Sequence, residues 1–416
     1  MSSFNIREHV VRCQHSRERP AGVERGRENE LWMHVKQYIP KSNTSPKTSD
    51  VTIIGAQANG FPKECYEPFW EDVCARLRVK GKGVRGIWVA DMASQGRSGI
   101  INEGVVGPDQ SWWDHGRDLL FLINQFQDEI PHPIIGVGHS VGASHLAHLS
   151  LMHPRLLHSL VLIDPIMQPD VRIHTTFARL STNRRDIWPS RAVAAEKFRA
   201  SKFYQQWDPR VLEKWIEFGL RDLPTEQYPE LPPGANKNDP PVTLSTTVMQ
   251  EVYLYLRPYY RDPRLLQDDE ALPEDLDPPF DMPEGRQLYH KLPELKPSVL
   301  FVFGSKSEAS PLDLRQDKMK RTGSGYGGSG GAENGRVKEV VLDCGHLVGM
   351  EKPVESAEAT AGFMAEELGR WEAREKEREE ALARLGRKER VGINALWREK
   401  LGVEEPKTKE RKGTNL

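Results

Sequence analysis

A chain of 416 residues with a formal net charge of −2 has room for a large core, and it carries no overall field that would attract nucleic acid or an anionic membrane. It holds no uncharged apolar stretch of about 18 residues, and its N-terminus lacks the apolar core of a signal peptide, so we expect a soluble protein that is not secreted. The four cysteines, Cys13, Cys65, Cys74 and Cys344, lack the spacing of a metal site, which predicts reduced thiols and no bound metal.

The first half of the chain alternates between short β-branched runs and helix-like segments. Two alternating segments, around residues 5–14 and 31–39, predict an antiparallel edge. Further strands are expected at residues 51–56, 86–90, 133–137 and 158–163, with helices around residues 69–77 and 112–126. Such β-α alternation predicts an α/β fold with a doubly wound, mostly parallel sheet.

Between residues 165 and 297 the pattern changes to aromatic, charged and proline-broken helical pieces, which predicts an inserted lid. We interpret the lid's aromatic residues mainly as its own core, with the lining of an acyl pocket as the alternative: Trp188, Phe203, Tyr204, Trp207, Trp215, Phe218, Tyr253 and Tyr255. The arginine-rich stretch 184–191 is interpreted as solvated surface, with contact to substrate phosphates as the alternative. Residues 232–241 and 268–283 are expected to be surface loops.

The sheet resumes at residues 298–304 and 337–342, on either side of a glycine-rich stretch at 323–331. That stretch contains G-x-G-x-x-G, but no strand directly precedes it and no clear helix follows, so we interpret it as a flexible loop and not a dinucleotide site. A helix is expected over 353–368, followed by a charged helix or association arm. The predicted organisation is an α/β core at 1–165 and 298–368, a lid at 166–297, and a charged C-terminal helix and tail at 369–416.

The sequence Gly-His-Ser-Val-Gly at residues 138–142 joins a short apolar run to a helix-like run, which is the pattern of a nucleophile elbow. The chemistry requires both glycines, because a Cβ on either side of the strained serine turn would collide with the neighbouring strand or helix. We therefore predict that Ser140 is a catalytic nucleophile, with a merely structural serine turn as the weaker alternative. His139, inside the elbow, is interpreted as a packing residue.

A nucleophilic serine needs a base and an orienting acid from loops at the carboxyl edge of the sheet. His346 follows the last strand and is the predicted general base. Asp164 ends the strand after the elbow helix and is favoured as the acid. The alternative is Glu308, which is disfavoured partly because Ser307 stands where the acid commonly lies after the strand at 298–304.

Two backbone N–H groups are predicted to hold the oxyanion that forms during the reaction. Val141 supplies one, because it directly follows the serine at the start of the helix. Phe61 supplies the other from the loop at residues 59–62, where Gly60 lets the chain turn. Pro62 has no N–H and is not a donor.

These motifs make the chain resemble the α/β-hydrolases, and it is similar to fungal peroxisomal acyl-CoA hydrolases of the mycophenolic acid type and to toxin-biosynthesis hydrolases. The resemblance extends from about residue 5 to 368, and the pieces that carry it are Ala58-Asn59-Gly60-Phe61-Pro62-Lys63-Glu64, residues 138–143, Asp164-Pro165, Trp207-Asp208-Pro209-Arg210, the glycine-rich loop and Cys344-Gly345-His346. It implies a triad of Ser140, His346 and Asp164, an acyl-CoA thioester substrate, and often a homodimer.

The predicted function is hydrolysis of an acyl thioester in two stages, with no metal or redox cofactor. A carboxylester hydrolase or lipase with the same triad is the second hypothesis, and a non-catalytic hydrolase-like binding protein is the third. Members of the resembled group often end in a Ser-Lys-Leu peroxisomal signal. This chain ends in Thr414-Asn415-Leu416, which keeps only the leucine, so peroxisome and cytoplasm both stay open as predicted locations.

Overall fold

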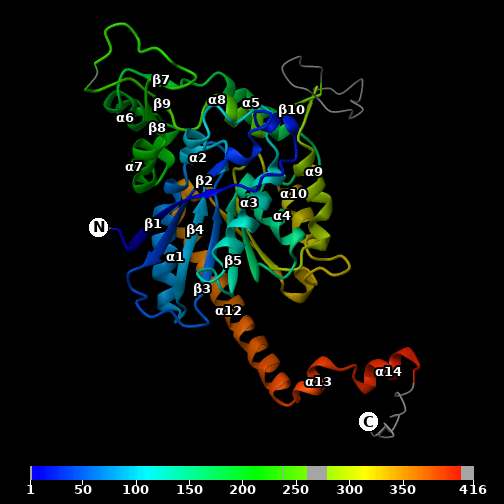
Figure 1. The fold of residues 1–416 in the computed structure, drawn as a ribbon. Helices are drawn as coiled ribbons and strands as arrows, with labels where there is room; N and C mark the ends of the chain where they lie inside the picture. Colours follow the sequence, from blue (N-terminus) through cyan, green and yellow to red (C-terminus); the bar gives the residue numbers. More distant parts are fainter. Residues whose placement is uncertain (1, 237, 260–278, 404–416) are drawn as a thin grey trace, which may run out of the picture. The chain divides into compact units, whose positions relative to one another are not determined.

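The computed structural model describes residues 2–236, 238–259 and 279–403 (Figure 1). The chain divides into two compact units, Met1–Leu368 and Gly369–Leu416, and the first unit contains the sheet and the predicted site residues.

The first unit is built around one eight-stranded sheet whose strand order is β1-β2-β4-β3-β5-β6-β12-β13. The antiparallel pairs are β1 with β2 and β2 with β4, and the other neighbouring pairs are parallel. The predicted antiparallel edge and mostly parallel sheet are therefore confirmed. The strands are β1 (Phe4–Arg12), β2 (Trp32–Pro40), β3 (Val51–Ala56), β4 (Val84–Ala90), β5 (Ile134–His139), β6 (Ser159–Ile163), β12 (Ser298–Gly304) and β13 (Val337–Leu342).

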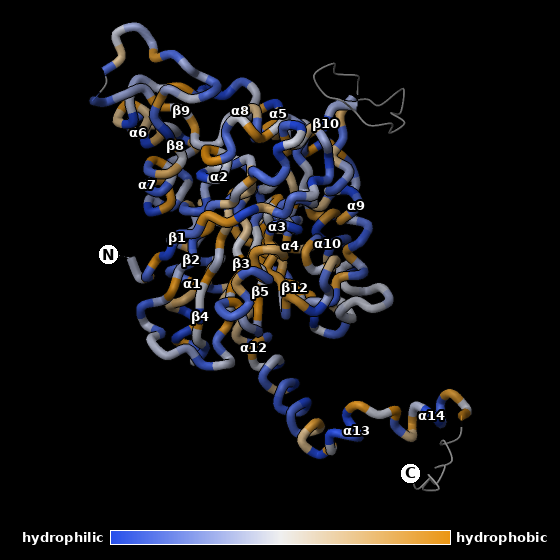
Figure 2. Tube along the Cα trace, viewed as in Figure 1, coloured by the Kyte–Doolittle hydropathy of each residue, from blue (hydrophilic) through white to orange (hydrophobic). Residues whose placement is uncertain are grey.

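Helices cover both faces of the sheet, because successive residues of a buried strand point to opposite sides. Ile53 of β3 packs in one apolar cluster with α1 (Glu67–Val79) and the first part of α12 (Pro353–Ala383). Its neighbour Ile54 packs in a second cluster with α3 (Trp112–Gln125) and α4 (Val141–Met152). Figure 2 shows the result as apolar strands β5 and β12 at the centre of the unit, beneath more hydrophilic outer segments.

The segment between β6 and β12, for which the sequence predicts a lid, contains helices together with short strands that the sequence pattern did not indicate. Strands of two or three residues are too short to show a period of two, which is why they were missed. The helices are α5 (Arg172–Thr182), α6 (Arg191–Ala200), α7 (Pro209–Phe218), α8 (Val248–Tyr255) and α9 (Pro283–Lys291). The strands are β7 (Ile187–Trp188), β8 (Leu220–Asp222), β9 (Val242–Leu244), β10 (Arg257–Pro258) and β11 (Phe280–Asp281).

The tryptophans named above pack inside the protein, and Arg191 forms hydrogen bonds within it. Trp188, Trp207 and Trp215 are buried, which confirms the core interpretation for these three residues. Arg191, by contrast, is not simply solvated, because its guanidinium donates to the carbonyl oxygens of Ile216 and Glu217 at the end of α7, at 3.0 and 3.1 Å. These bonds satisfy carbonyls that a helix C-terminus leaves without partners.

The glycine-rich stretch is a loop between α10 (Leu312–Arg321) and a short 3-10 helix, Ala332–Asn334, so it lacks the strand and helix of a dinucleotide motif. It is more closely tied to the protein than a flexible linker. The N–H groups of Gly323, Gly325 and Ser329 each donate to a carbonyl oxygen between Leu292 and Leu295 at 2.9 Å.

In the second unit, α12 runs on without a break to Ala383, and α13 (Arg387–Val391) and α14 (Ala395–Leu401) follow. The charged segment after residue 368 therefore continues the helix predicted over 353–368. Across the described parts of the chain, no helix has the combined length and apolar character needed to cross a bilayer.

Candidate active site

Ser140 lies in a strained turn between the end of β5 and the start of α4. Its backbone has φ 56° and ψ −120°, a conformation that residues other than glycine rarely adopt. A Cβ on Gly138 would lie 2.6 Å from the carbonyl oxygen of Gly142, and a Cβ on Gly142 would lie 2.2 Å from that of Ala56. The elbow therefore needs glycine at both positions, as predicted, and it presents the serine at the carboxyl edge of the sheet.

His346 lies in the loop between β13 and α11 (Val348–Glu351), between the other two predicted triad residues. Its Nε2 is 2.9 Å from Oγ of Ser140, and its Nδ1 is 2.6 Å from Oδ2 of Asp164. A carboxylate only accepts hydrogen bonds, so the Nδ1–H donates to Asp164 and Nε2 is left to accept the serine O–H. Three side chains from distant parts of the sequence thus meet within hydrogen-bonding distance.

Asp164 directly follows β6, is fully buried and has φ 40°, the other positive φ outside glycine among the described residues. Burial alone would raise the pKa of its carboxyl group, but the hydrogen bond and the charge of His346 outweigh burial, so the pKa lies below its ordinary value. Ser307 donates a further hydrogen bond to Oδ2. The carboxylate is therefore ionised when it holds the imidazole.

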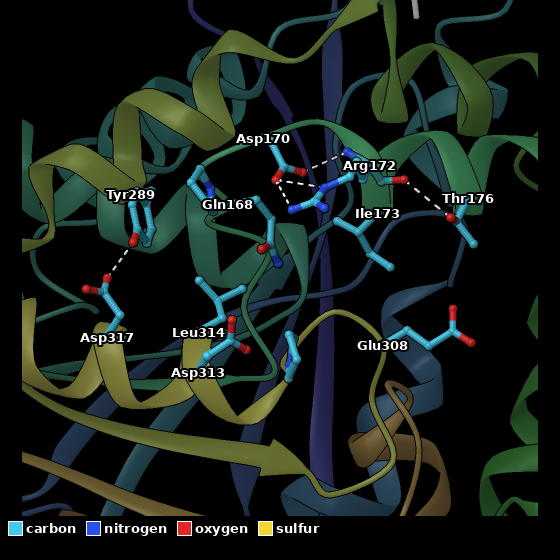
Figure 3. A pocket seen from close by; sticks show the side chains of 12 residues that line it. Gln168, Asp170, Arg172, Ile173, Thr176, Tyr289, Glu308, Asp313, Leu314 and Asp317 are labelled. Carbon is cyan, nitrogen blue, oxygen red and sulfur yellow. Dashed lines mark hydrogen bonds and ion pairs between the residues drawn. The ribbon is translucent and has the colours of Figure 1, made fainter.

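Glu308, the alternative acid, is exposed and lines an open cavity of about 700 Å³ (Figure 3). Among the described residues, Asp164 is the carboxylate bonded to His346. The cavity has four carboxylates and one guanidinium, Arg172, which is itself paired with Asp170. That lining is unfavourable for an anionic ligand, because like charges repel in a partly desolvated space.

The two predicted oxyanion donors differ in their present partners. Val141 is the first residue of α4, and the first N–H groups of a helix have no partner within the helix. The N–H of Phe61, the other predicted donor, instead faces the carbonyl oxygen of Ala58 at the long distance of 3.4 Å.

The loop that carries Phe61 is held from three sides. The N–H of Gly60 donates to Gln95 at 2.8 Å, and the side chain of Asn59 donates to the carbonyl oxygen of Glu251 at 2.8 Å. The ring of Phe61 packs between Trp207 and Trp215 of the lid, with centroids 5.7 Å from each. Gly60 has φ +82°, and a Cβ there would lie 2.8 Å from the Glu251 carboxylate, so this position also requires glycine.

The segment between β6 and β12 places aromatic side chains next to His346. The ring of Phe177 on α5 stacks on the His346 imidazole with centroids 5.0 Å apart, and Tyr255 on α8 contacts Phe177 in turn. Phe177 also borders an apolar cluster that contains Val141 and Leu254. Sequence reasoning missed Phe177, because one aromatic residue on a lid helix carries no signal that distinguishes it from core.

Within the described residues, no group of three histidine, cysteine or acidic side chains is placed to hold a metal ion. The model of the alpha/beta hydrolase family matches residues 58–359, a range that includes Ser140, Asp164 and His346. The chain belongs to the α/β-hydrolase family. It is accordingly a hydrolase, and its doubly wound sheet is the sheet of that fold.

The chain is similar to relatives over most of its length. It is 37% identical over 397 residues to the type I acyl-CoA thioesterase mpaH' of Penicillium brevicompactum, an alignment that covers 90% of each chain. It is 36% identical over 397 residues to the type I acyl-CoA thioesterase mpaH of Penicillium roqueforti, again covering 90% of each. Among solved structures, the peroxisomal alpha-beta-hydrolase Lpx1 from Saccharomyces cerevisiae superposes with a TM-score of 0.67 at 15% identity and covers 97% of this chain and 96% of that one. That likeness shows a shared fold.

Proposed function

We propose that this α/β-hydrolase cleaves acyl-CoA thioesters, with Ser140 as nucleophile, His346 as general base and acid, and Asp164 as the orienting carboxylate. The observation that carries the proposal is the imidazole of His346, which lies 2.9 Å from the serine hydroxyl and 2.6 Å from the carboxylate. The substrate class is supported by relatives 36–37% identical over 90% of this chain, whose names describe acyl-CoA thioesterases.

In the first stage, Nε2 of His346 takes the Ser140 proton as Oγ attacks the thioester carbonyl carbon. The carbonyl oxygen becomes an oxyanion that the N–H groups of Val141 and Phe61 stabilise. Phe61 is suited to this change of partner, because its 3.4 Å bond to Ala58 is long and weak and is readily exchanged for one to a full negative charge. When the tetrahedral intermediate collapses, the C–S bond breaks and His346 returns the proton to the departing thiolate.

In the second stage, water gives a proton to His346 and adds to the acyl carbon, and the C–O bond to Ser140 then breaks. His346 returns the proton to the serine, and the free carboxylic acid leaves. Asp164 stays ionised throughout, keeps the Nδ1–H tautomer in place and stabilises the imidazolium that forms in each stage.

The surroundings of the serine favour an apolar acyl group. Val141, next to the nucleophile, packs with Met92, Ile166 and Leu254, and the Phe177 ring covers His346. Apolar walls with a few oriented polar groups are typical of sites for acyl chains. The cavity that Glu308 lines has four carboxylates, which would repel the phosphates of CoA. We therefore expect the nucleotide part of CoA to bind outside this cavity.

The direct test replaces Ser140 with alanine and measures thiol release from a panel of acyl-CoA esters. We expect activity to fall at least about ten-thousand-fold while the protein stays folded. The matched control is Ser150→Ala, which changes a buried serine on α4, the helix that follows Ser140. Its hydroxyl donates to the carbonyl oxygen of Ala147, and the variant should keep parental activity. An S140A variant that retains activity within tenfold of the parent would contradict the proposal.

The same panel separates the alternatives. A higher kcat/KM on p-nitrophenyl esters or triglycerides than on every acyl-CoA would reassign the protein as a carboxylester hydrolase or lipase. Failure of a fluorophosphonate probe to label Ser140 would favour the non-catalytic binding protein. The homodimer and the peroxisomal or cytoplasmic location stay predictions, and the terminal residues 414–416 lie outside the described residues.

A further inference from the structure

A chain of three hydrogen bonds joins the loops on either side of Ser140. The backbone N–H of Ala58, at the start of the loop that carries Phe61, is 3.0 Å from the hydroxyl oxygen of Tyr66. That hydroxyl is 2.7 Å from Nδ1 of His139, and Nε2 of His139 is 2.9 Å from the carbonyl oxygen of His346. His139 is the residue before Ser140, so this series of hydrogen bonds runs through the elbow itself.

The chemistry of the groups fixes the direction of every bond. A carbonyl oxygen only accepts, so Nε2 of His139 carries the hydrogen and donates it to His346. A neutral imidazole has one N–H, so Nδ1 is the acceptor and the Tyr66 hydroxyl is its donor. The tyrosine oxygen then uses a lone pair to accept the N–H of Ala58. Every donor in this series therefore has an acceptor.

The environment keeps this arrangement in one protonation state. His139 and Tyr66 are both nearly inaccessible to solvent, at 1% and 3% exposure. Burial, together with the nearby charge of His346, lowers the pKa of His139 to about 4. Burial raises the pKa of Tyr66 above its ordinary value. Both groups are therefore neutral at the pH values where a serine hydrolase works.

We infer that His139 and Tyr66 are positioning residues that fix the backbone of His346 and the oxyanion loop relative to Ser140. The inference rests on the proposed function, because it gives these three hydrogen bonds a role in the reaction at that same site. His346 follows Gly345 in a loop, so its imidazole is only as well placed as its backbone. A displacement of about 1 Å in a reacting group can lower turnover about a hundredfold. An effect of that size is expected when one of these three hydrogen bonds is removed.

The test exploits the difference in length between asparagine and glutamine. The amide nitrogen of a glutamine reaches the place of Nε2 and can still donate to the His346 carbonyl, whereas asparagine is one methylene shorter and reaches only the place of Nδ1. We expect His139→Asn to lower kcat about a hundredfold with KM within twofold of the parent, and His139→Gln to recover most of that loss. Tyr66→Phe should lower kcat about tenfold, and adding it to H139N should cost little more, because both changes cut one chain.

Rates are expressed per serine titrated with a fluorophosphonate, so that misfolded protein does not count. His158→Asn is the matched control, because Nε2 of His158 lies 2.9 Å from the carbonyl oxygen of Glu367, away from the triad, and its loss should leave kcat per titrated serine unchanged. Parental kcat per titrated serine in H139N would overturn the inference. If H139N does not fold, Y66F is judged by the same criterion. A parent protein that the probe does not label would instead refute the proposed function.

Discussion

Strands β6 and β12 are parallel neighbours that end at the same edge of the sheet, yet they supply the site with different chemistry. The end of β6 supplies Asp164, which is buried, ionised and bonded to His346. The end of β12 supplies Ser307, a buried neutral donor to that carboxylate, and then Glu308, which is exposed at a cavity. The residue after β6 carries the negative charge, and Ser307 after β12 donates a hydrogen bond to it.

This difference has an electrostatic reason. Two carboxylates side by side at adjacent strand ends would repel, and one of them would take up a proton. A serine beside Asp164 removes that repulsion and adds a hydrogen bond that favours the ionised form. An acid at the end of β6 therefore goes together with a neutral residue at the end of β12.

The largest effect is expected for Asp164→Asn. The amide cannot hold the Nδ1–H tautomer or stabilise the imidazolium, so kcat should fall about ten-thousand-fold with a smaller change in KM. Asp343→Asn is the matched control, because that exposed aspartate lies just after β13 and pairs with Lys306 at 2.8 Å. Steady-state hydrolysis of one acyl-CoA by both variants measures the difference, and equal losses would argue against Asp164 as the acid.

Lys318 of α10, the helix after β12, contacts the turn that contains Asp164. It is fully buried, and its Nζ donates to the carbonyl oxygen of Pro165 at 2.8 Å. Burial lowers the pKa of this amine to about 8, so between that pH and the ordinary value of 10.5 the folded protein binds fewer protons than the unfolded chain. The free energy of unfolding of the parent should therefore rise relative to Lys318→Met as the pH increases from 8 to 10, by about 2 kcal/mol.

Urea unfolding of the parent and K318M at a series of pH values gives that difference. The control is Lys320→Met, which removes an exposed lysine from the same helix and should show no such trend between pH 8 and 10. A parent-to-K318M difference that stays constant with pH would mean that the buried amine is not perturbed as described.

A smaller effect is expected for Ser307→Ala, which leaves the charge in place and removes one donor to it. A hydrogen bond to a charged group contributes about 1.5 to 3 kcal/mol, and part of that should appear as a roughly tenfold lower kcat/KM. Ser305→Ala is the control two residues earlier, since its exposed hydroxyl bonds to Asp343 at 3.3 Å. Unchanged kcat/KM in S307A would show that Asp164 does not depend on the end of β12.

The smallest effect is expected for Glu308→Gln. This exposed side chain lines the cavity of Figure 3, and His346 is already bonded to Asp164, so kcat/KM should stay within twofold of the parent. A larger loss at Glu308 than at Asp164 under identical conditions would reverse the assignment of the acid. The difference in activity between this variant and D164N should be the largest difference between the two strand ends.

Local sequence was enough for the parts of the protein that depend on neighbours in the chain. The parallel strands, the elbow around Ser140 and the need for its two glycines all follow from short patterns, because period and steric crowding act over a few residues. His346 and Asp164 were predicted from their places at strand ends, since the carboxyl ends of parallel strands meet at one edge of the sheet. The short lid strands β7 to β9 had no such pattern and were missed.

The amino-acid sequence by itself determined the fold class, the elbow around Ser140 and the order of the predicted site residues along the chain, because these follow from patterns along the chain. Only the tertiary structure decided the donor role of Ser307, the contact of Phe177 with His346 and the path from Ala58 through Tyr66 and His139. Those contacts join residues that are mostly far apart in the chain, and a hydrogen bond depends on distances and directions in space that no local pattern records.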